Sequence, residues 1–130
     1  MTVRDIAWIH DAFDAFDHII FLGELSARGV TARWMRHRKA KSTFVFGQCD
    51  FERSRVELSQ VLRWHWVPEY VALSVLHHEC CHVVYGDEHG GAFKLAEERY
   101  LHHTASEIWC SDGDNLDRLL AASPPPKEPA

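Results

Sequence analysis

The first apolar pattern along the chain has the period of an α-helix. Five large apolar residues follow one another at spacings of three and four: Ile6, Ile9, Phe13, Phe16 and Ile20. This spacing places them on one face of a helix, and the other face is assigned to Asp5, Asp11, Asp14 and Asp17. A glycine at position 23 suits the end of a helix. The pattern therefore predicts an amphipathic helix over residues 3–22.

Three short segments after Gly29 have the composition of β-strands. They are rich in β-branched and aromatic residues and cover Thr31–Arg36, Thr43–Phe46 and Arg55–Ser59. In the last of them polar and apolar residues alternate, as in a strand with one buried face. Gly47 and the polar residues around Asp50 are expected to form a turn.

Helical patterns resume at Pro68. Proline suits the first turn of a helix, and the helix dipole favours the acidic Glu69 that follows it. This helix is predicted to run to Tyr85 and to stop at Gly86.

Two more helices are expected after it. The first starts beyond Gly90 and Gly91, and its buried side is assigned to Phe93, Ala96, Tyr100 and Ala105. A short final helix is predicted over Asp114–Ala121, with its apolar residues at Leu116, Leu119 and Leu120. Residues 123–130 are rich in proline, and we expect them to form a disordered tail that does not pack.

These elements predict an α+β fold, with an N-terminal helix and a three-stranded sheet followed by helices. The 130 residues are enough for one domain, which we place at residues 1–122. Hydrophobic residues make up 46% and charged residues 25% of the chain, close to the averages of globular domains. The composition therefore excludes fibrous and largely disordered classes of protein.

The apolar runs of the chain are short. Ile19–Leu22, one of the longest, falls far below the roughly 18 residues that a membrane-spanning helix needs. The N-terminal segment has acids within its apolar stretch and lacks the pattern of a secretory signal. We therefore expect a cytoplasmic protein that does not engage a membrane.

Histidine is the anomaly of the composition, at 10 of 130 residues, and it prompts a search for a metal site. The four cysteines show no CxxC spacing, which argues against a zinc ribbon or finger. We expect these cysteines to be reduced thiols, as is usual in a cytosolic protein.

The helix predicted after Pro68 carries an HExxH motif, from His78 to His82. Residues four apart lie one above the other on a helix, so the imidazoles of His78 and His82 can bind one Zn²⁺ ion. Glu79 projects about 100° further round the axis, beside the metal, where it can take a proton from a water molecule. His77 points elsewhere and is the weaker candidate ligand.

A third ligand can come from one of two places. His89 follows the end of the helix, and its spacing from His82 is one residue longer than in the metzincins, whose downstream methionine turn this chain lacks. A carboxylate from the next helix, Glu97 or Glu98, is the alternative, although the separation from His82 is short for that arrangement. We favour His89.

The order of these motifs resembles the SprT-like zinc metallopeptidases and the related WLM and YgjP-type domains. The resemblance rests on a strand ending in Val56–Ser59, on HExxH within Val75–His82, and on H-G-x-x-F at His89–Phe93. It extends over roughly residues 5–120, with HExxH and H-G-x-x-F as its specific parts. It implies a small zincin-like domain with one zinc ion per chain, bound by His78, His82 and His89.

The resemblance and the chemistry of the motif together imply hydrolysis of a peptide bond in a protein or peptide substrate. Zinc would activate a water molecule, and Glu79 would act as general base and then pass the proton to the leaving amine. Four residues are candidates for stabilising the oxyanion: Tyr85, Tyr100, His102 and His103. Five acids could orient the ligating imidazoles: Asp87, Glu88, Glu97, Glu98 and Glu107.

The cysteines next to the motif leave another arrangement open. Cys81 lies three residues after His78 and could approach the same face of the helix, whereas Cys80 should point into the core. A site that combines cysteine and histidine and includes Cys110 is the alternative to simple packing of these thiols.

Charge is unevenly distributed along the chain. The net charge is −5, yet the segment Arg28–Lys41 contains six basic residues and no acid. Some SprT-like proteins act on proteins bound to DNA, and this segment is where such contact with DNA would fall. Two other functions stay open: a non-catalytic, zinc-stabilised module that binds nucleic acid or protein, and a metal-free structural domain.

Overall fold

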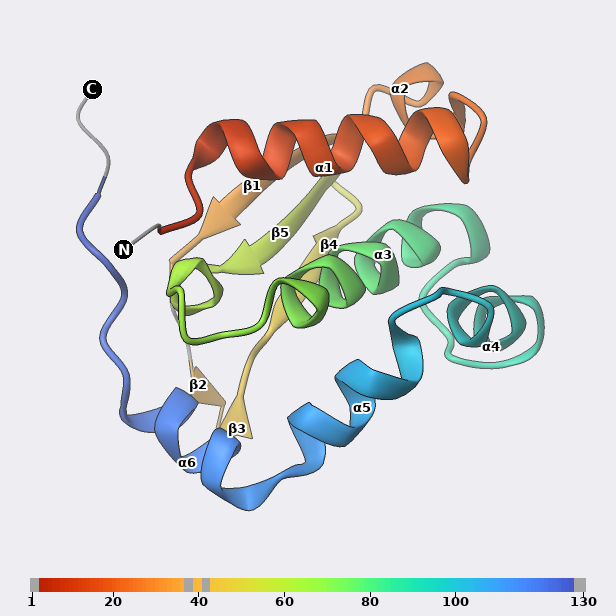
Figure 1. Cartoon of the computed structure of the whole chain (residues 1–130). Coiled ribbons are helices and arrows are strands. Elements are labelled where there is room, and N and C mark those ends of the chain that lie inside the picture. The colour runs from red at the N-terminus through yellow and green to blue at the C-terminus, as the bar shows by residue number, and fades with distance from the viewer. Residues whose placement is uncertain (1–2, 37–38, 41–42, 128–130) are drawn as a thin grey trace.

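The computed structural model describes residues 3–36, 39–40 and 43–127 of the chain and has an α+β architecture (Figure 1). The helices found in these ranges are α1 (Ile6–Ile19), α2 (Glu24–Ala27), the 3₁₀-helix η1 (Gln60–Arg63), α3 (Glu69–Tyr85), α4 (Gly91–Glu98), α5 (His103–Ser111) and α6 (Gly113–Ala121). The strands are β1 (Thr31–Met35), β2 (Lys39–Ala40), β3 (Thr43–Phe44), β4 (Gly47–Asp50) and β5 (Arg55–Ser59).

The main sheet is mixed and has the strand order β1-β5-β4. β1 pairs in parallel with β5, with Thr31 opposite Arg55, and β4 pairs antiparallel to β5, with Gly47 opposite Leu58. β2 and β3 form a separate antiparallel pair. Among the strands that the structure describes, β4 pairs with β5 alone, so it is an edge strand of this sheet.

The third strand of the sheet lies where the sequence led us to expect a turn. The expected strand Thr43–Phe46 is shortened to β3, which pairs with β2 outside the main sheet, and Gly47–Asp50 forms β4. Gly47 fits this strand because of its size: a Cβ atom there would lie 2.7 Å from the carbonyl oxygen of Glu57. Close approach of two backbones, which glycine permits, thus overrides its usual preference for turns.

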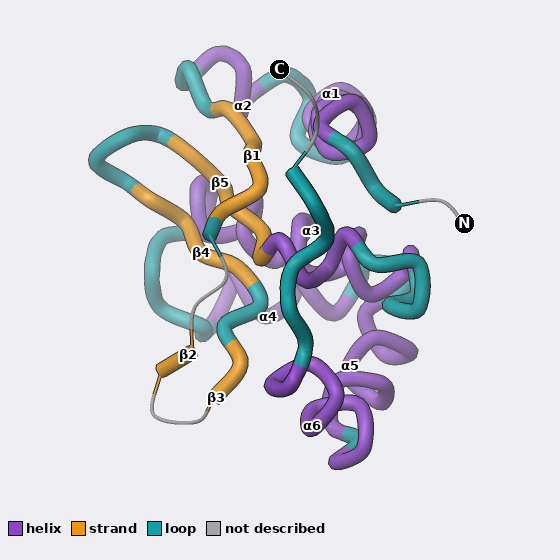
Figure 2. The backbone as a smooth tube through the Cα atoms, turned by 90° about the vertical axis from the view of Figure 1, so that its left-hand side faces the viewer, coloured by secondary structure: helices purple, strands orange, loops and turns teal. Residues whose placement is uncertain are grey.

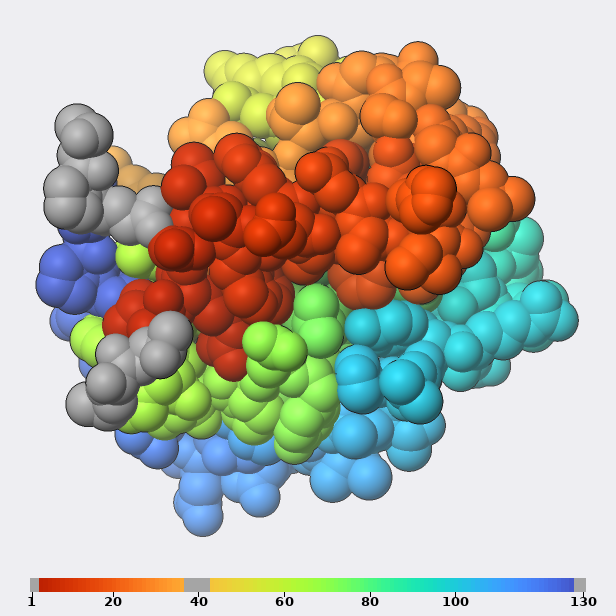
Figure 3. All heavy atoms as spheres, turned by 45° about the horizontal axis from the view of Figure 1, so that its top comes forward, coloured from red at the N-terminus to blue at the C-terminus, as the bar shows by residue number. Residues whose placement is uncertain are grey.

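α1 and α3 cover one face of the sheet (Figures 1 and 2). α1 packs against β1, and α3 packs against β5 and β4. Ile9, Phe13 and Phe16 of α1 enter the core as predicted, whereas Ile6 and Ile20 at its two ends are 51% and 42% exposed. Figure 3 shows α1, in red, across the middle of the visible face.

Asp17 is a correction to the predicted polar face of the first helix. Its side chain is buried and accepts hydrogen bonds from the backbone N–H groups of Leu25, at 2.8 Å, and Ser26, at 3.2 Å. These N–H groups belong to the first turn of α2, which has no carbonyl partner for them within the helix. Asp17 therefore fastens α2, a helix that the sequence pattern did not predict, to the end of α1.

β5 and α3 have the bounds that the sequence predicted. α3 ends because Gly86 adopts a φ of +89°, a left-handed conformation that glycine tolerates best.

The helix expected after Gly90 and Gly91 is in fact two helices, α4 and α5, interrupted at residues 99–102. Phe93 is buried as predicted, but Ala105 is exposed on α5. At the interruption the ring of Tyr100 stacks on His77 of α3, with ring centroids 4.4 Å apart. This tertiary contact accompanies the change of direction that lets α5 run back along α3 (Figure 1).

The C-terminal segment also differs from expectation. α6 begins at Gly113, where Asp112 caps it by accepting from the N–H of Asp114 at 2.9 Å. Beyond it, Trp64 donates from Nε1 to the carbonyl oxygen of Ser123 at 2.7 Å, and Pro125 is buried. The sequence had led us to expect no packing here; residues 128–130 of the expected tail lie outside the described residues.

Among the described residues, no helix combines the length and the apolar character needed to cross a membrane.

Candidate metal centre and its cleft

Three histidines converge at the end of α3. Nε2 of His82 lies 3.2 Å from Nε2 of His78 and 2.9 Å from Nε2 of His89. The potential ligand atoms of the three side chains all lie within 4.8 Å of one another. Three imidazole nitrogens directed at one point form a set that could hold a metal ion. We call His78, His82 and His89 the histidine triad.

The other ring nitrogens of two of these histidines have partners that fix the rings. His82 donates from Nδ1 to the carbonyl oxygen of Gly86 at 2.9 Å, and Nδ1 of His78 contacts the carboxylate of Glu97. Such contacts leave the lone pair of Nε2 available to a metal ion and are typical of metal-binding histidines. The donor set therefore fits a metal ion.

The contact between His78 and Glu97 also governs their charges. Burial lowers the pKa of His78, but the hydrogen bond with Glu97 and the negative charges of Glu79 and Glu97 together outweigh it, and the pKa lies above its ordinary value. Burial likewise raises the pKa of Glu97, yet the hydrogen bond with His78 and the charges of the neighbouring histidines together lower it overall. For His82 burial dominates and lowers the pKa, which favours the neutral imidazole that a metal requires.

Phe93 supports the triad from below. It is 1% exposed, and its ring centroid lies 5.1 Å from that of His78, 4.6 Å from that of His82 and 5.1 Å from that of His89. Phe93, the aromatic residue of H-G-x-x-F, thus packs against all three imidazoles and restricts their rotation.

The structure separates the two alternatives for the third position of the triad. His89 lies on the exposed loop between α3 and α4, and its Nε2 lies close to the ring nitrogens of the other two histidines. Glu97 instead contacts Nδ1 of His78, the ring nitrogen that points away from the triad. Glu98 is half-exposed and lies 4.0 Å from Lys94. Glu97 was one of five acids between which the sequence could not choose. Its position one turn after Phe93 on α4 is the signal that could have selected it.

Glu79 lies beside the triad in different surroundings. Its side chain is 6% exposed, and within the described ranges no hydrogen bond to its carboxylate is found. Burial raises its pKa to about 7, against the opposing influence of His78. A carboxyl group with a pKa near neutrality is suited to accept and release a proton.

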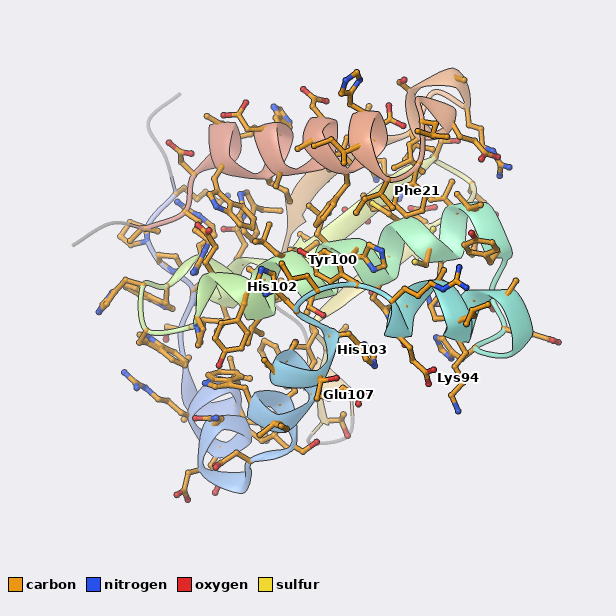
Figure 4. The ribbon with its side chains drawn as sticks, turned by 45° about the vertical axis from the view of Figure 1, so that its right-hand side comes forward. Phe21, Lys94, Tyr100, His102, His103 and Glu107 are labelled. Atoms are coloured by element: carbon orange, nitrogen blue, oxygen red, sulfur yellow. The ribbon has the colours of Figure 1, made fainter. Side chains whose placement is uncertain are left out.

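A cleft of about 410 Å³ opens on Glu79 and His78, and its size lies within the range of small-molecule and peptide sites. α3 forms one wall, α5 faces it, and the chain around Gly47 closes a third side. Of the four candidates for stabilising an oxyanion, His103 alone lines this cleft. Figure 4 shows His103 and Glu107 on successive turns of α5, and their side chains approach to 3.5 Å.

The remaining candidates for the oxyanion have other contacts. Tyr100 stacks on His77, and His102 lies against Tyr70 and Tyr100. Tyr85 lies at the last turn of α3 and is 43% exposed.

His77 and the cysteines take no part in the triad. His77 is buried, and desolvation lowers its pKa to about 4, so it stays neutral beside Tyr100. The thiol of Cys81 lies 3.7 Å from Nδ1 of His77, and Cys80 is fully buried in the core. Cys49, Cys80, Cys81 and Cys110 are all free thiols.

Two described arginines of the basic segment Arg28–Lys41 lie near acidic side chains. Arg28 pairs with Glu24 and donates to the carbonyl oxygen of Val83 at 2.8 Å, while Arg33 lies 3.5 Å from Glu57. Arg36 is exposed. Arg38 and Lys41 lie outside the described residues, as does the side chain of Lys39.

Comparisons with family models, with curated proteins and with solved structures gave no match to this chain.

Proposed function

We propose that this protein is a zinc-dependent metallopeptidase whose α+β domain is zincin-like and related to the SprT-like family. One observation carries the proposal. Three imidazole nitrogens converge beside the buried carboxylate of Glu79, which has no hydrogen-bond partner among the described residues, and both His78 and Glu79 open onto one cleft. A purely structural metal site has no use for such a carboxylate, whereas hydrolysis requires a base at that place.

The chemistry of the triad favours zinc. Three neutral imidazoles are the ligand set of several catalytic zinc sites, and such sites keep a fourth position for water or substrate. Zinc, when bound, would lower the pKa of a water molecule and polarise the carbonyl group of the substrate. His78, His82 and His89 would hold it, one ion per chain, with Glu97 keeping His78 oriented.

Glu79 performs the proton transfers in this proposal. Its carboxylate accepts a proton from the attacking water and then delivers that proton to the amine of the leaving peptide. Its burial assists the first step, because desolvation disfavours the charged carboxylate and so favours its protonation. His103, which also lines the cleft, would hydrogen-bond the substrate.

The substrate is a protein or peptide that enters the cleft between α3 and α5. Proteins associated with DNA are a narrower proposal, and exposed Arg36 is the described residue of the basic segment that supports it. Stimulation of cleavage by single-stranded DNA, lost when Arg36 is replaced by glutamate, would test this part alone.

The central test combines zinc content with cleavage of casein. We expect one zinc ion per wild-type chain, loss of zinc and activity in His78→Ala and His89→Ala, and loss of activity with retained zinc in Glu79→Gln. His10→Ala, which removes an exposed histidine of α1, is the matched control and should change neither property.

Other outcomes would replace the proposal. Stoichiometric zinc with no cleavage of any protein or peptide tested would favour a non-catalytic zinc-stabilised module. Wild-type protein that binds no zinc would contradict the peptidase function itself. Zinc retained by His89→Ala would show that another residue is the third ligand.

A further inference from the structure

A second hollow of the molecular surface lies where β1 and β5 end. It is a groove of about 560 Å³ between the end of β1, the start of η1 and residues 123–127, which run past the strand ends after α6 (Figure 1). A smaller groove of about 370 Å³ adjoins it and shares four of its lining residues. Among the described residues, neither has a lining residue in common with the cleft beside Glu79. We call the two together the basic groove.

Four basic side chains line the basic groove: Arg33, Arg36, Arg63 and Lys127. Its described lining contains no acidic residue. Arg33 has an acidic neighbour outside the lining, because its Nε lies 3.5 Å from Oε2 of Glu57 on the adjacent strand. For the other three cations no ion pair with a described carboxylate is found. Most of the positive charge of the groove is therefore uncompensated by a direct partner.

Arg63 is the buried member of this set, at 4% exposed. Its guanidinium donates to the carbonyl oxygens of Arg4, at 2.7 Å, and Pro126, at 3.1 Å, and to the side-chain oxygen of Gln60, at 2.9 Å. All three acceptors are neutral. Because a buried charge in a protein normally has a partner of opposite charge, a buried arginine that borders a groove and has neutral acceptors among the described residues indicates a place for an anion.

Asp5 is the other acid near this end of the molecule, and it is engaged elsewhere. Its carboxylate accepts from the backbone N–H of Trp8 at 2.8 Å and caps α1. Its side of the chain borders a separate hollow with His65 and Glu69. Even with Asp5 and Glu57 counted against the four basic residues, the groove keeps an excess of positive charge.

The burial of these cations favours a small phosphate ligand. Arg63 is buried, whereas Arg36 and Lys127 are exposed at the rim of the groove. A compact ligand with two linked phosphate groups can place one group beside the buried guanidinium and the other beside the rim. The planar fork of arginine matches the oxygens of a phosphate group. A nucleic-acid backbone is bulkier, and it suits the two exposed cations better than the buried one.

We infer that the basic groove binds a small ligand with two or more linked phosphate groups, with Arg36, Arg63 and Lys127 as its principal contacts. The inference does not rest on the proposed peptidase function, because the groove and the cleft have no described lining residue in common. A protein that binds no zinc and cleaves no peptide can still bind such a ligand, so the two proposals fail separately.

The first experiment measures binding of pyrophosphate by isothermal titration calorimetry at low ionic strength, with inorganic phosphate and sulfate as comparisons. We expect one pyrophosphate per chain, bound about tenfold or more tightly than either comparison anion, because its second phosphate group reaches further cations. No binding of pyrophosphate, or equal affinity for all three anions, would overturn the inference.

The second experiment assigns the binding to the groove. Arg36→Gln and Lys127→Gln each remove one exposed charge and should weaken pyrophosphate binding by about threefold to tenfold. Arg53→Gln is the matched control, because it removes an exposed arginine just before β5, at the opposite end of that strand from η1. Its affinity should equal that of the wild type. Wild-type affinity in both rim variants would refute the assignment.

Arg63→Gln tests the buried cation and should weaken pyrophosphate binding by about tenfold or more. The change also removes hydrogen bonds to Arg4 and Pro126, so circular dichroism first establishes whether the variant folds. If it does not fold, the two rim variants decide the question. A folded Arg63→Gln protein that binds pyrophosphate as tightly as the wild type would overturn the inference.

Two further measurements separate the groove from other places where phosphate could bind. Phosphate groups can bind zinc, so the titration is repeated after a chelator has removed metal from the protein, and the affinity should be unchanged. Loss of binding would move the ligand to the triad and overturn the inference. A fluorescein-labelled single-stranded DNA is the other probe. DNA that displaces pyrophosphate and binds more tightly than it does would assign the groove to a nucleic-acid backbone instead.

Discussion

Two carboxylates of this protein are equally shielded from solvent and have opposite surroundings. Asp17, between α1 and α2, is 7% exposed, and Glu79, in the cleft, is 6% exposed. Asp17 accepts two backbone hydrogen bonds, from Leu25 and Ser26, whereas the carboxylate of Glu79 faces the cleft beside Gly47.

Their pKa values show what this difference means. Burial raises the pKa of Asp17, but the hydrogen bonds outweigh it, and the pKa lies below its ordinary value. For Glu79 burial dominates and raises the pKa to about 7. A fold normally satisfies a buried carboxylate because leaving it unpaired is costly. Glu79, whose carboxylate has no such hydrogen bonds among the described residues, is therefore the better candidate for a catalytic group.

The largest expected effect separates the two carboxylates by activity. Glu79→Gln should lower kcat/KM for peptide cleavage by about 10²- to 10⁴-fold, the usual contribution of a general base. Asp17→Asn, the equivalent change at the structural position, should leave kcat/KM within about twofold in the folded protein. Initial-rate measurements on one quenched peptide would test both, and a similar loss in the two variants would remove the distinction.

The pH dependence of stability should differ in sign at the two positions. In metal-free protein Glu79 has a raised pKa, so its favourable contribution is present below pH 4.5 and is lost as the pH rises through about 7. Asp17 has a lowered pKa, so its contribution is present above pH 3.8 and is lost on acidification.

Urea unfolding of metal-free protein would measure this contrast. Between pH 4.5 and 8, Glu79→Gln should become more stable relative to wild type by about 3 kcal/mol, which corresponds to the raised pKa. Glu98→Gln, at a half-exposed position, is the control and should show no comparable trend. A difference between Glu79→Gln and wild type that stays constant with pH would contradict the interpretation of Glu79.

A third carboxylate, Glu97, differs from both Asp17 and Glu79. It is hydrogen-bonded, as Asp17 is, but its partner is His78, a candidate metal ligand. Glu97→Gln keeps the shape but removes the charge that orients and polarises His78. Zinc affinity should fall by about 10- to 100-fold, as for other partners of metal-binding histidines. Competition with a zinc chelator would measure the change, with Glu98→Gln again as control. Unchanged affinity would limit Glu97 to packing.

Local signals predicted the parts of the fold that bring the triad together. Pro68 and Glu69 mark the start of α3, Gly86 marks its end, and the alternating pattern of β5 marks both ends of that strand. The spacing of His78 and His82 follows from helix geometry alone, and the structure places His89 beside them. In these segments the local sequence determines where each helix or strand begins and ends.

Other features depended on contacts between distant residues. Gly47 belongs to a strand because two backbones approach closely there, and the interruption after α4 accompanies the stacking of Tyr100 on His77. Asp17 has the helical position of an exposed residue and is buried because α2 folds back over it. The selection of Glu97 among the nearby acids likewise required the packing of α4 against α3. The pattern of residues along the sequence does not contain these contacts between distant parts of the chain.

The smallest expected effect tests the structural member of the pair. In Asp17→Asn the side-chain oxygen can still accept one backbone hydrogen bond, while the second acceptor and the negative charge beside the first turn of α2 are lost. The free energy of unfolding at pH 7 should fall by about 1 kcal/mol, measured by urea denaturation. Asp14→Asn, at an exposed position of the same helix, should change it by less than about 0.5 kcal/mol. Because Asp17 holds α2 to α1 and touches neither the triad nor the cleft, zinc stoichiometry should be unchanged in both variants; loss of zinc in Asp17→Asn would show that the two regions are coupled.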